Sequence, residues 1–298
     1  MSKRRLPVGK NRLIDQLSAS APVLTDGAWG TELQRRGLGP GEMPDAWNLH
    51  HPERVEEVAR AYVEAGSRIV LTNTFRANRI AFAGHPDAGR IAEINRRGAA
   101  ISKRAAAGRA YVFGSVGPSG KQLLTGEVSE ADLREAFSEQ TGALAEGGAD
   151  AIVIETMTDL AEAHLAVQAA LATGLPVVAC MVFDSGRDGD RTMMGVDPER
   201  AAREMDGWGV DAIGANCGNG VEHYLPICAR LAAATERPIW IKPNAGIPEL
   251  VDGKVVYRTT PEQFASFLPK FVEAGASFIG GCCGTDPSFI AAMHARMR

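Results

Sequence analysis

Short apolar runs alternate with longer segments of helical periodicity along the whole chain, and this alternation limits the possible folds more than any other feature. The helical segments repeat apolar residues at helical spacing, as at 51–65. Eight of the short runs have the composition and length of buried strands, and they lie at 22–25, 68–73, 110–116, 151–155, 176–182, 211–216, 238–242 and 277–281. A regular order of strand, helix and strand predicts a parallel sheet.

The joints between helix and strand repeat one local pattern. It occurs as AGSRIV at 65–70, GADAI at 148–152, GVDAI at 209–213 and AGASFI at 274–279. In each copy a glycine can end the helix in the left-handed conformation just before the strand. Eight such units are the number that a closed parallel barrel requires, so we expect an α/β fold with a single (β/α)8 TIM barrel.

We expect one domain over residues 1–298, with 1–20 as an N-terminal extension, because no linker or composition shift divides the chain. A doubly wound open sheet is the main alternative. That fold usually carries a glycine-rich dinucleotide turn after its first strand, and DGAWG at 26–30 is a poor match.

Charge and hydropathy indicate a small-molecule partner. The net charge of −4 argues against nucleic acid or an anionic membrane as partner. No apolar run approaches the roughly 18 residues of a membrane helix, and the basic start at 1–5 is not followed by the apolar core of a signal peptide. We therefore expect a cytoplasmic protein.

The five cysteines are an odd number, and Cys282 and Cys283 are adjacent, which strains a mutual disulfide. Cys217 ends the sixth predicted strand, and the pair follows the eighth. Because the carboxyl ends of barrel strands meet at one face, these three thiols can share a metal ion, and zinc favours thiolates. Taken alone, a cysteine in the position of Cys217 is more often a small core residue. Cys180 and Cys228 are interpreted as structural.

Other strands also end in polar residues, which predicts a functional barrel mouth. Asp26 and Glu155 are interpreted as carboxylates that clamp an ammonium group, although Asp26 could instead cap a helix. Lys242 could form a Schiff base, or lie on the outer side of the barrel. The segment GSVGPSG at 114–120 could bind phosphate, but a tight turn is the simpler interpretation.

Three motifs together resemble the homocysteine S-methyltransferase family: GANCG at 214–218, KPNAG at 242–246 and GGCCG at 280–284. The likeness extends to DGAWGT at 26–31, LTNTF at 71–75, SVGPSG at 115–120 and IETM at 154–157, and so covers nearly the whole chain. This family includes betaine-dependent and S-methylmethionine-dependent enzymes and the homocysteine module of cobalamin-dependent methionine synthase, all zinc-dependent (β/α)8 barrels.

The resemblance implies roles for particular residues. Cys217, Cys282 and Cys283 would bind Zn²⁺, with Asn244 in the fourth position until homocysteine displaces it. Asp26 and Glu155 would hold the amino group of the substrate. The remaining pocket residues would be Gly27, Thr72, Asn73 and Asn216. Lys242 becomes a flanking residue on this reading.

The same resemblance implies transfer of a methyl group to homocysteine, which yields methionine. PDAWNLHHP at 44–52 and the run through GIPE at 246–249 look most like short bacterial betaine-homocysteine methyltransferases, so glycine betaine is the expected donor. A quaternary ammonium favours an aromatic wall. Trp29 and Trp47 are the candidates in a chain with 6% aromatic residues, although both could simply pack their loop over the barrel.

Alternatives remain at this stage. The donor could be S-methylmethionine or a separate methylcorrinoid protein. A hypothesis of another class is a catalytically silent, zinc-stabilised barrel that binds a thiol. The outer helix faces carry no decisive apolar stripe, so the sequence leaves a homo-oligomer open.

Overall fold

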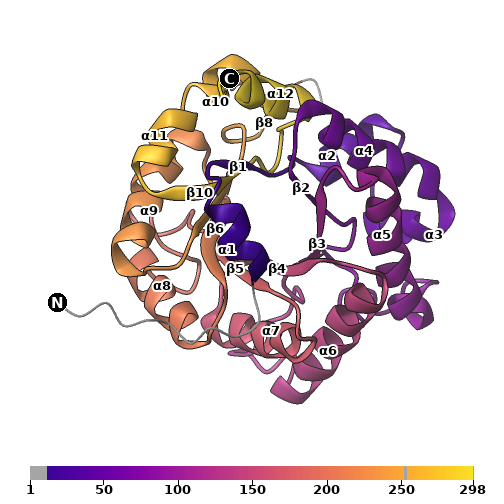
Figure 1. The fold of residues 1–298 in the computed structure, drawn as a ribbon. Coiled ribbons are helices and arrows are strands. Elements are labelled where there is room, and N and C mark those ends of the chain that lie inside the picture. Colours follow the sequence, from indigo (N-terminus) through magenta and orange to yellow (C-terminus); the bar gives the residue numbers. More distant parts are fainter. Residues whose placement is uncertain (1–11, 252–253, 298) are drawn as a thin grey trace.

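The computed structural model describes residues 12–251 and 254–297, and within them eight parallel strands form a barrel surrounded by helices (Figure 1). The strands pair in the order β1-β10-β7-β6-β5-β4-β3-β2. Their bounds are β1 (Val23–Leu24), β2 (Ile69–Leu71), β3 (Tyr111–Val116), β4 (Ala151–Met157), β5 (Val177–Met181), β6 (Ala212–Cys217), β7 (Ile239–Pro243) and β10 (Ala276–Ile279). The predicted (β/α)8 fold is confirmed, and all eight predicted strands are present.

A helix or helical segment follows most strands and covers the outside of the barrel. The larger ones are α4 (Pro52–Ala65), α5 (Ile91–Ala106), α6 (Glu130–Glu146), α7 (Leu160–Ala172), α8 (Pro198–Gly207), α9 (Val221–Ala234) and α12 (Pro287–Ala295). The shorter ones are α2 (Trp29–Arg35), η1 (Pro44–Ala46), α3 (Trp47–His50), η2 (Ala88–Arg90), α10 (Pro261–Ala265) and α11 (Leu268–Glu273). None of the helices in the described part of the chain is long and apolar enough to cross a membrane.

The repeated glycine joints have the conformation that the sequence predicts. Gly66, Gly148, Gly209 and Gly275 have φ angles of +111°, +92°, +84° and +99°. Side chains other than glycine are strained in this region. Each joint therefore turns the chain from an outer helix directly into the next buried strand.

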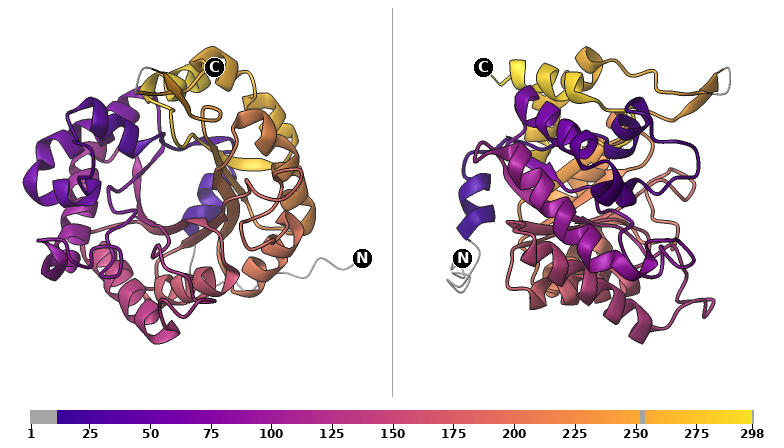
Figure 2. Two further views of the ribbon diagram at one scale, coloured as in Figure 1. Left: turned by 180° about the vertical axis from the view of Figure 1, so that it is seen from behind. Right: turned by 90° about the vertical axis from the view of Figure 1, so that its right-hand side faces the viewer.

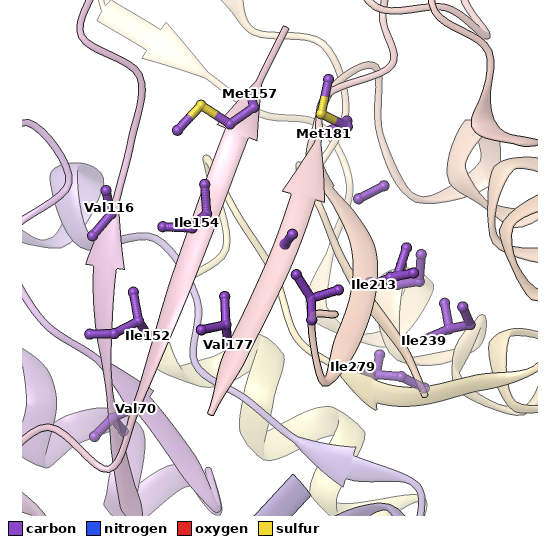
Figure 3. Packing of buried hydrophobic residues seen from close by; sticks show 14 of the residues in the cluster. Val70, Val116, Ile152, Ile154, Met157, Val177, Met181, Ile213, Ile239 and Ile279 are labelled. Carbon is purple, nitrogen blue, oxygen red and sulfur yellow. The ribbon is translucent and has the colours of Figure 1, made fainter. Parts of the chain in front are cut away.

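The apolar core has two layers. Outward-facing strand residues pack against the helices, and Figure 3 shows Val70, Ile152, Ile154, Val177 and Ile213 among them. The second layer fills the barrel itself and includes the inward-facing side chains Phe113, Trp240 and Phe278. Phe113 and Trp240 are stacked, with ring centroids 5.9 Å apart.

The chain before β1 closes the amino end of the barrel. Helix α1 (Arg12–Ser18) contributes the buried side chains of Ile14 and Leu17 to the interior layer. In the right-hand view of Figure 2 this helix lies beyond one end of the barrel, opposite the strands Glu249–Val251 and Lys254–Val256. The predicted extension at 1–20 is thus part of the fold from Arg12 onward, and its first eleven residues lie outside the described part.

Two features of the carboxyl end were not predicted. The loop after β7 forms a hairpin of β8 (Glu249–Val251) and β9 (Lys254–Val256), which pair antiparallel.

The seam between β1 and β2 is bridged by a hydrogen bond from the backbone N–H of Arg68 to the carbonyl of Leu24, 2.8 Å long. Asp26 extends this bridge, because its carboxylate accepts from the N–H of Leu71 at 2.7 Å.

Candidate functional site

Three cysteines meet at the carboxyl end of the barrel. Cys217 is the last residue of β6, and Cys282 and Cys283 follow β10. Their sulfur atoms all lie within 4.8 Å of one another, and all three are free thiols. Cys217 has a φ of +70°, a rare angle for a residue other than glycine. Such strain is often found at functional sites, and the sulfur atom of Cys217 lies beside those of the pair.

The chemistry of this donor set fits a soft divalent cation. Hydrogen bonds from the thiols of Cys282 and Cys283 hold the pKa of Cys217 far below its usual range, at about 3. The same interaction raises the pKa of Cys283 to about 11, and that of Cys282 also rises. Three thiols packed this closely cannot all be ionised by themselves. A cation that favours thiolates, such as zinc, removes this conflict.

Asn244 joins the two cysteine segments. Its side-chain nitrogen donates to the carbonyl of Gly218 at 2.6 Å, and its side-chain oxygen accepts from the backbone N–H of Cys283 at 3.0 Å. The sequence assigned Asn244 as a fourth metal ligand, and that role stays a prediction. In the structure its amide holds the loops after β6 and β10 in register.

Asp26 is fully buried and its carboxylate is already satisfied by three donors. Lys242 Nζ lies 2.5 Å from Oδ1, while the indole N–H of Trp29 donates to Oδ2 at 2.8 Å and the N–H of Leu71 at 2.7 Å. Two earlier interpretations are therefore wrong. Asp26 does not cap α2, whose N-cap is Ala28 without a side-chain bond, and Lys242 does not lie on the outer side of the barrel, because its side chain is 2% exposed.

Glu155 is the second buried carboxylate of the site. Ser115 Oγ donates to its Oε1 at 2.5 Å, and Asn216 Nδ2 lies 3.3 Å from its Oε2. Burial raises the pKa of Glu155, and the positive charge of Lys242 opposes that rise. Asn216 Nδ2 also lies 3.9 Å from Cys282 Sγ. One amide therefore connects the carboxylate with the cysteine cluster.

The cysteines and Glu155 line one cavity of about 340 Å³ at the barrel mouth. Among the predicted site residues, Gly27, Trp29 and Asn73 also line it. Thr72 and Asn216 are buried behind the wall, where Thr72 accepts from the N–H of Ser115 at 3.0 Å. These two support the pocket and do not form its surface.

Trp47 is not brought to this cavity. Its side chain is 4% exposed and packs in the outer core beside α4. Its indole donates to Glu42 at 3.0 Å, and the guanidinium of Arg54 lies 5.3 Å from the ring centroid. Tertiary packing of the loop over the barrel, the alternative stated for the sequence, accounts for this tryptophan.

Sequence reasoning missed several residues that line the cavity, among them Phe75, Asp45, Arg76 and Thr156. Phe75 and Arg76 follow β2 directly, so the rule that pointed to Thr72 and Asn73 could have reached them. Gly117 makes room for Phe75, since a Cβ there would lie 2.5 Å from the ring. Asp45 comes from η1, which lies within the PDAWNLHHP segment at 44–52, but the sequence analysis gave this residue no role of its own.

The fold and the thiol cluster together define a (β/α)8 barrel with a candidate metal site at its mouth. Comparison with known proteins shows which protein family this barrel belongs to. The family model described as homocysteine S-methyltransferase matches residues 23–297. The chain belongs to this family, whose members are S-methyltransferases that act on homocysteine.

Curated relatives agree with this assignment. The chain is 33% identical over 297 residues to methionine synthase of Mycobacterium tuberculosis, a match that covers 93% of this chain and 25% of that protein. It is 30% identical to homocysteine S-methyltransferase of Escherichia coli, covering 92% and 94%. It is 29% identical to betaine–homocysteine S-methyltransferase 1 of Danio rerio, covering 96% and 76%. The chain thus spans about a quarter of the length of the methionine synthases that it matches.

Solved structures of homocysteine methyltransferases agree with the family assignment. The metallated form of the homocysteine methyltransferase MmuM from Escherichia coli superposes with a TM-score of 0.80 at 26% identity, covering 96% of this chain and all of that one. The oxidised form of the same enzyme gives a TM-score of 0.76 at 26% identity.

Proposed function

We propose that this protein is a zinc-dependent homocysteine S-methyltransferase that forms methionine. The observation that carries the proposal is the meeting of three thiols from two separate strand ends at the wall of one cavity. A silent zinc-stabilised barrel needs no cavity beside its metal. The opening next to the sulfur atoms favours an incoming thiol.

Cys217, Cys282 and Cys283 would hold the zinc ion, with Asn244 near enough to the cysteine loops to serve as the exchangeable fourth ligand. Zinc bound there keeps thiols ionised, so an acceptor thiol that joins the shell would be held as a reactive thiolate. This requires reduced cysteines, and we therefore propose the cytoplasm as the place where the protein works.

The residues around the cluster would orient the acceptor. Glu155 is a buried carboxylate whose ionised form gains from a cationic partner, so it is suited to the α-ammonium of homocysteine. Asn216 holds Glu155 beside the sulfur atoms. Alignment of acceptor sulfur, methyl group and leaving group is the main contribution left to the protein, and such alignment can be worth roughly 7 to 11 kcal/mol.

The methyl donor that we propose is glycine betaine. The cavity has the size for a small molecule, and Trp29 and Phe75 supply two aromatic side chains to its wall. A quaternary ammonium is attracted to aromatic faces. In this proposal Phe75, and not Trp47, is the second aromatic side chain beside the quaternary ammonium.

A methylcorrinoid protein is the second candidate donor, and the rim of the mouth favours it. Most of the large hydrophobic side chains that are exposed in the described chain lie in loops after β3, β5 and β7: Leu124, Met193, Met194, Ile247, Leu250, Val251 and Val255. Where exposed apolar side chains gather into a patch, a protein partner often docks. A donor carried by a protein would have to reach the sulfur through this face.

A donor screen tests the proposal. Zinc-loaded protein with homocysteine is supplied separately with betaine, S-methylmethionine or a methylated corrinoid protein, and methionine is measured. We expect methionine and dimethylglycine with betaine. Turnover only with one of the other two donors would reassign the donor. No methionine with any donor, together with unfolding when zinc is removed, would support the silent barrel.

A further inference from the structure

The cavity wall has a second group of polar and aromatic residues, on the side away from Cys217. Trp29 and Asp45 come from the segment between β1 and β2, and Phe75 and Arg76 follow β2. In the ring of strands, β2 lies four strands from β6 in either direction, so its loop faces Cys217 across the mouth. We call Trp29, Asp45, Phe75 and Arg76 the β2-side wall.

Arg76 brings an unpaired positive charge to this wall. Within residues 12–251 and 254–297, no carboxylate oxygen lies within 4.0 Å of its guanidinium, and its side chain donates no hydrogen bond. The other cation of the cavity, Lys242, is paired with Asp26. The next arginine along the chain, Arg79, is paired with two glutamates of α6. An exposed guanidinium with free N–H donors can bind a carboxylate through two parallel hydrogen bonds.

The backbone that carries Phe75 and Arg76 is held in place. The carboxylate of Asp45 accepts from the N–H of Arg76 at 2.9 Å, and the carbonyl of Phe75 accepts from the N–H of Gly117 at 2.8 Å. Since a Cβ on Gly117 would lie 2.5 Å from the Phe75 ring, the absence of a side chain there gives the ring its room. The guanidinium therefore extends from a fixed point next to an aromatic side chain.

The β2-side wall thus combines two aromatic side chains with one anion and one cation. Aromatic faces attract a methylated ammonium or sulfonium cation, and a neighbouring carboxylate adds to that attraction. Asp45 is buried, and its charge interacts with that of Arg76 without an ion pair between the two described side chains. This wall is complementary to a small molecule that carries a methylated cation and a carboxylate a short distance apart.

We propose that Arg76 binds the carboxylate of the methyl donor, so that the β2-side wall selects small zwitterionic ammonium or sulfonium compounds as donors. The proposal rests on the proposed function and deepens it, because it assigns the residue that selects the donor. In the transfer, the acceptor thiolate forms a bond to one methyl carbon. The bond from that carbon to the donor nitrogen or sulfur breaks, and its electron pair stays on the donor, which leaves as dimethylglycine in the case of betaine.

Matched donors with and without a carboxylate test this role. Dimethylsulfonioacetate carries the carboxylate and trimethylsulfonium does not, and a sulfonium releases its methyl group readily enough for both to be measured. The zinc-loaded wild type with saturating homocysteine should prefer dimethylsulfonioacetate in kcat/KM. Arg76→Met should lower kcat/KM for this donor by roughly tenfold to a hundredfold, mainly through KM, because a charged hydrogen bond is lost. The value for trimethylsulfonium should not change.

Two further variants separate this role from a general disturbance of the loop. Arg76→Lys keeps the charge but not the paired donors, and it should recover part of the lost preference. Arg79→Met is the matched control, since Arg79 is an exposed arginine of the same loop that does not line the cavity. This variant should treat both donors as the wild type does.

Inhibition measures binding apart from turnover. The carboxylate 3,3-dimethylbutyrate has the shape of betaine without its cation, and it should compete with dimethylsulfonioacetate in the wild type. In Arg76→Met its inhibition constant should rise by the same factor as the KM. Tetramethylammonium, which has no carboxylate, should inhibit both proteins equally.

The outcomes are distinguishable. A wild type without preference for the carboxylate, an equal loss with both sulfonium donors, or no loss with either would overturn the role of Arg76, while methyl transfer to homocysteine still supported the proposed function. Turnover only with a methylated corrinoid protein would also overturn the zwitterionic donor and leave the zinc-dependent transfer standing. Absence of methionine with every donor would overturn both.

Discussion

The two ends of the barrel contain the same polar contact in different surroundings. At the mouth, Asp26 accepts from the N–H of Leu71 in β2 and from Lys242 Nζ. At the amino end, Asp150 accepts from the N–H of Val112 in β3 at 2.7 Å and from Lys103 Nζ at 2.9 Å. The mouth pair is 2% and 0% exposed, and the other pair is 42% and 25% exposed.

The difference shows that the same two residue types form a pair with very different burial at the two ends of the barrel. The exposed pair is solvated and links a helix to a strand. The buried pair lies near Glu155 and the cysteines. The low dielectric of this interior strengthens the electrostatic interactions between charged groups. At the amino end, by contrast, the apolar side chains of α1 pack into the barrel interior.

The largest expected effect is loss of the metal. Cys217→Ala should lower zinc affinity and methyl transfer by more than the roughly 10- to 100-fold that removal of a group behind a metal ligand costs, as measured by bound zinc and methionine formation. Cys228→Ala is the control, because Cys228 is buried in α9 away from the cluster. Equal loss of zinc in both variants would contradict a local metal site.

Next in size is the contrast between the two lysines. Lys242→Met leaves a buried carboxylate unpaired and should cost about 3–5 kcal/mol of unfolding free energy. Lys103→Met breaks an exposed pair and should cost less than about 1 kcal/mol. Urea unfolding measures both. Similar values for the two variants would show that burial does not separate the pairs.

The apolar end should respond in stability and not in metal binding. Ile14→Ala empties part of the interior layer and should cost about 2–5 kcal/mol, while the zinc content stays at that of the wild type. Asp15→Ala on the exposed side of α1 is the control, with a change within about 0.5 kcal/mol. A wild-type melting temperature for Ile14→Ala would mean that α1 does not close the barrel.

A pH effect is expected at the mouth. Burial raises the pKa of Asp45 from 3.8 to about 6. Because the folded state then binds the proton more tightly than the unfolded state, this group's contribution to stability is full below pH 3.8 and is lost as the pH rises through about 6. The loss is on the order of 3 kcal/mol.

Asp45→Asn removes the titration and can still accept from the N–H of Arg76. Subtracting the stability of this variant from that of the wild type, by urea unfolding from pH 4 to pH 8, should give a difference that falls across this range. A flat difference would rule out the raised pKa.

Local pattern was sufficient for much of the fold. The strands of the barrel and the glycine joints followed from periodicity and from the left-handed turns at Gly66 and Gly275, because each depends on neighbours in sequence. The same rule, that strand ends meet at one face, placed Cys217 near Cys282 and Cys283. The hairpin of β8 and β9 had no such periodic signal.

By itself, the sequence determined the barrel and the residue types at its mouth, since these follow from local propensity and chain order. Only the tertiary structure decided which polar group faces the cavity and which lies behind it. The substrate-binding role of Asp26 stays a prediction, and the fold adds contacts of its carboxylate with Lys242 and with the seam between β1 and β2. Trp47 was assigned to the cavity, but the fold gives that wall to Phe75. Residues distant in the chain compete for the same buried partners, and their packing alone settles that competition.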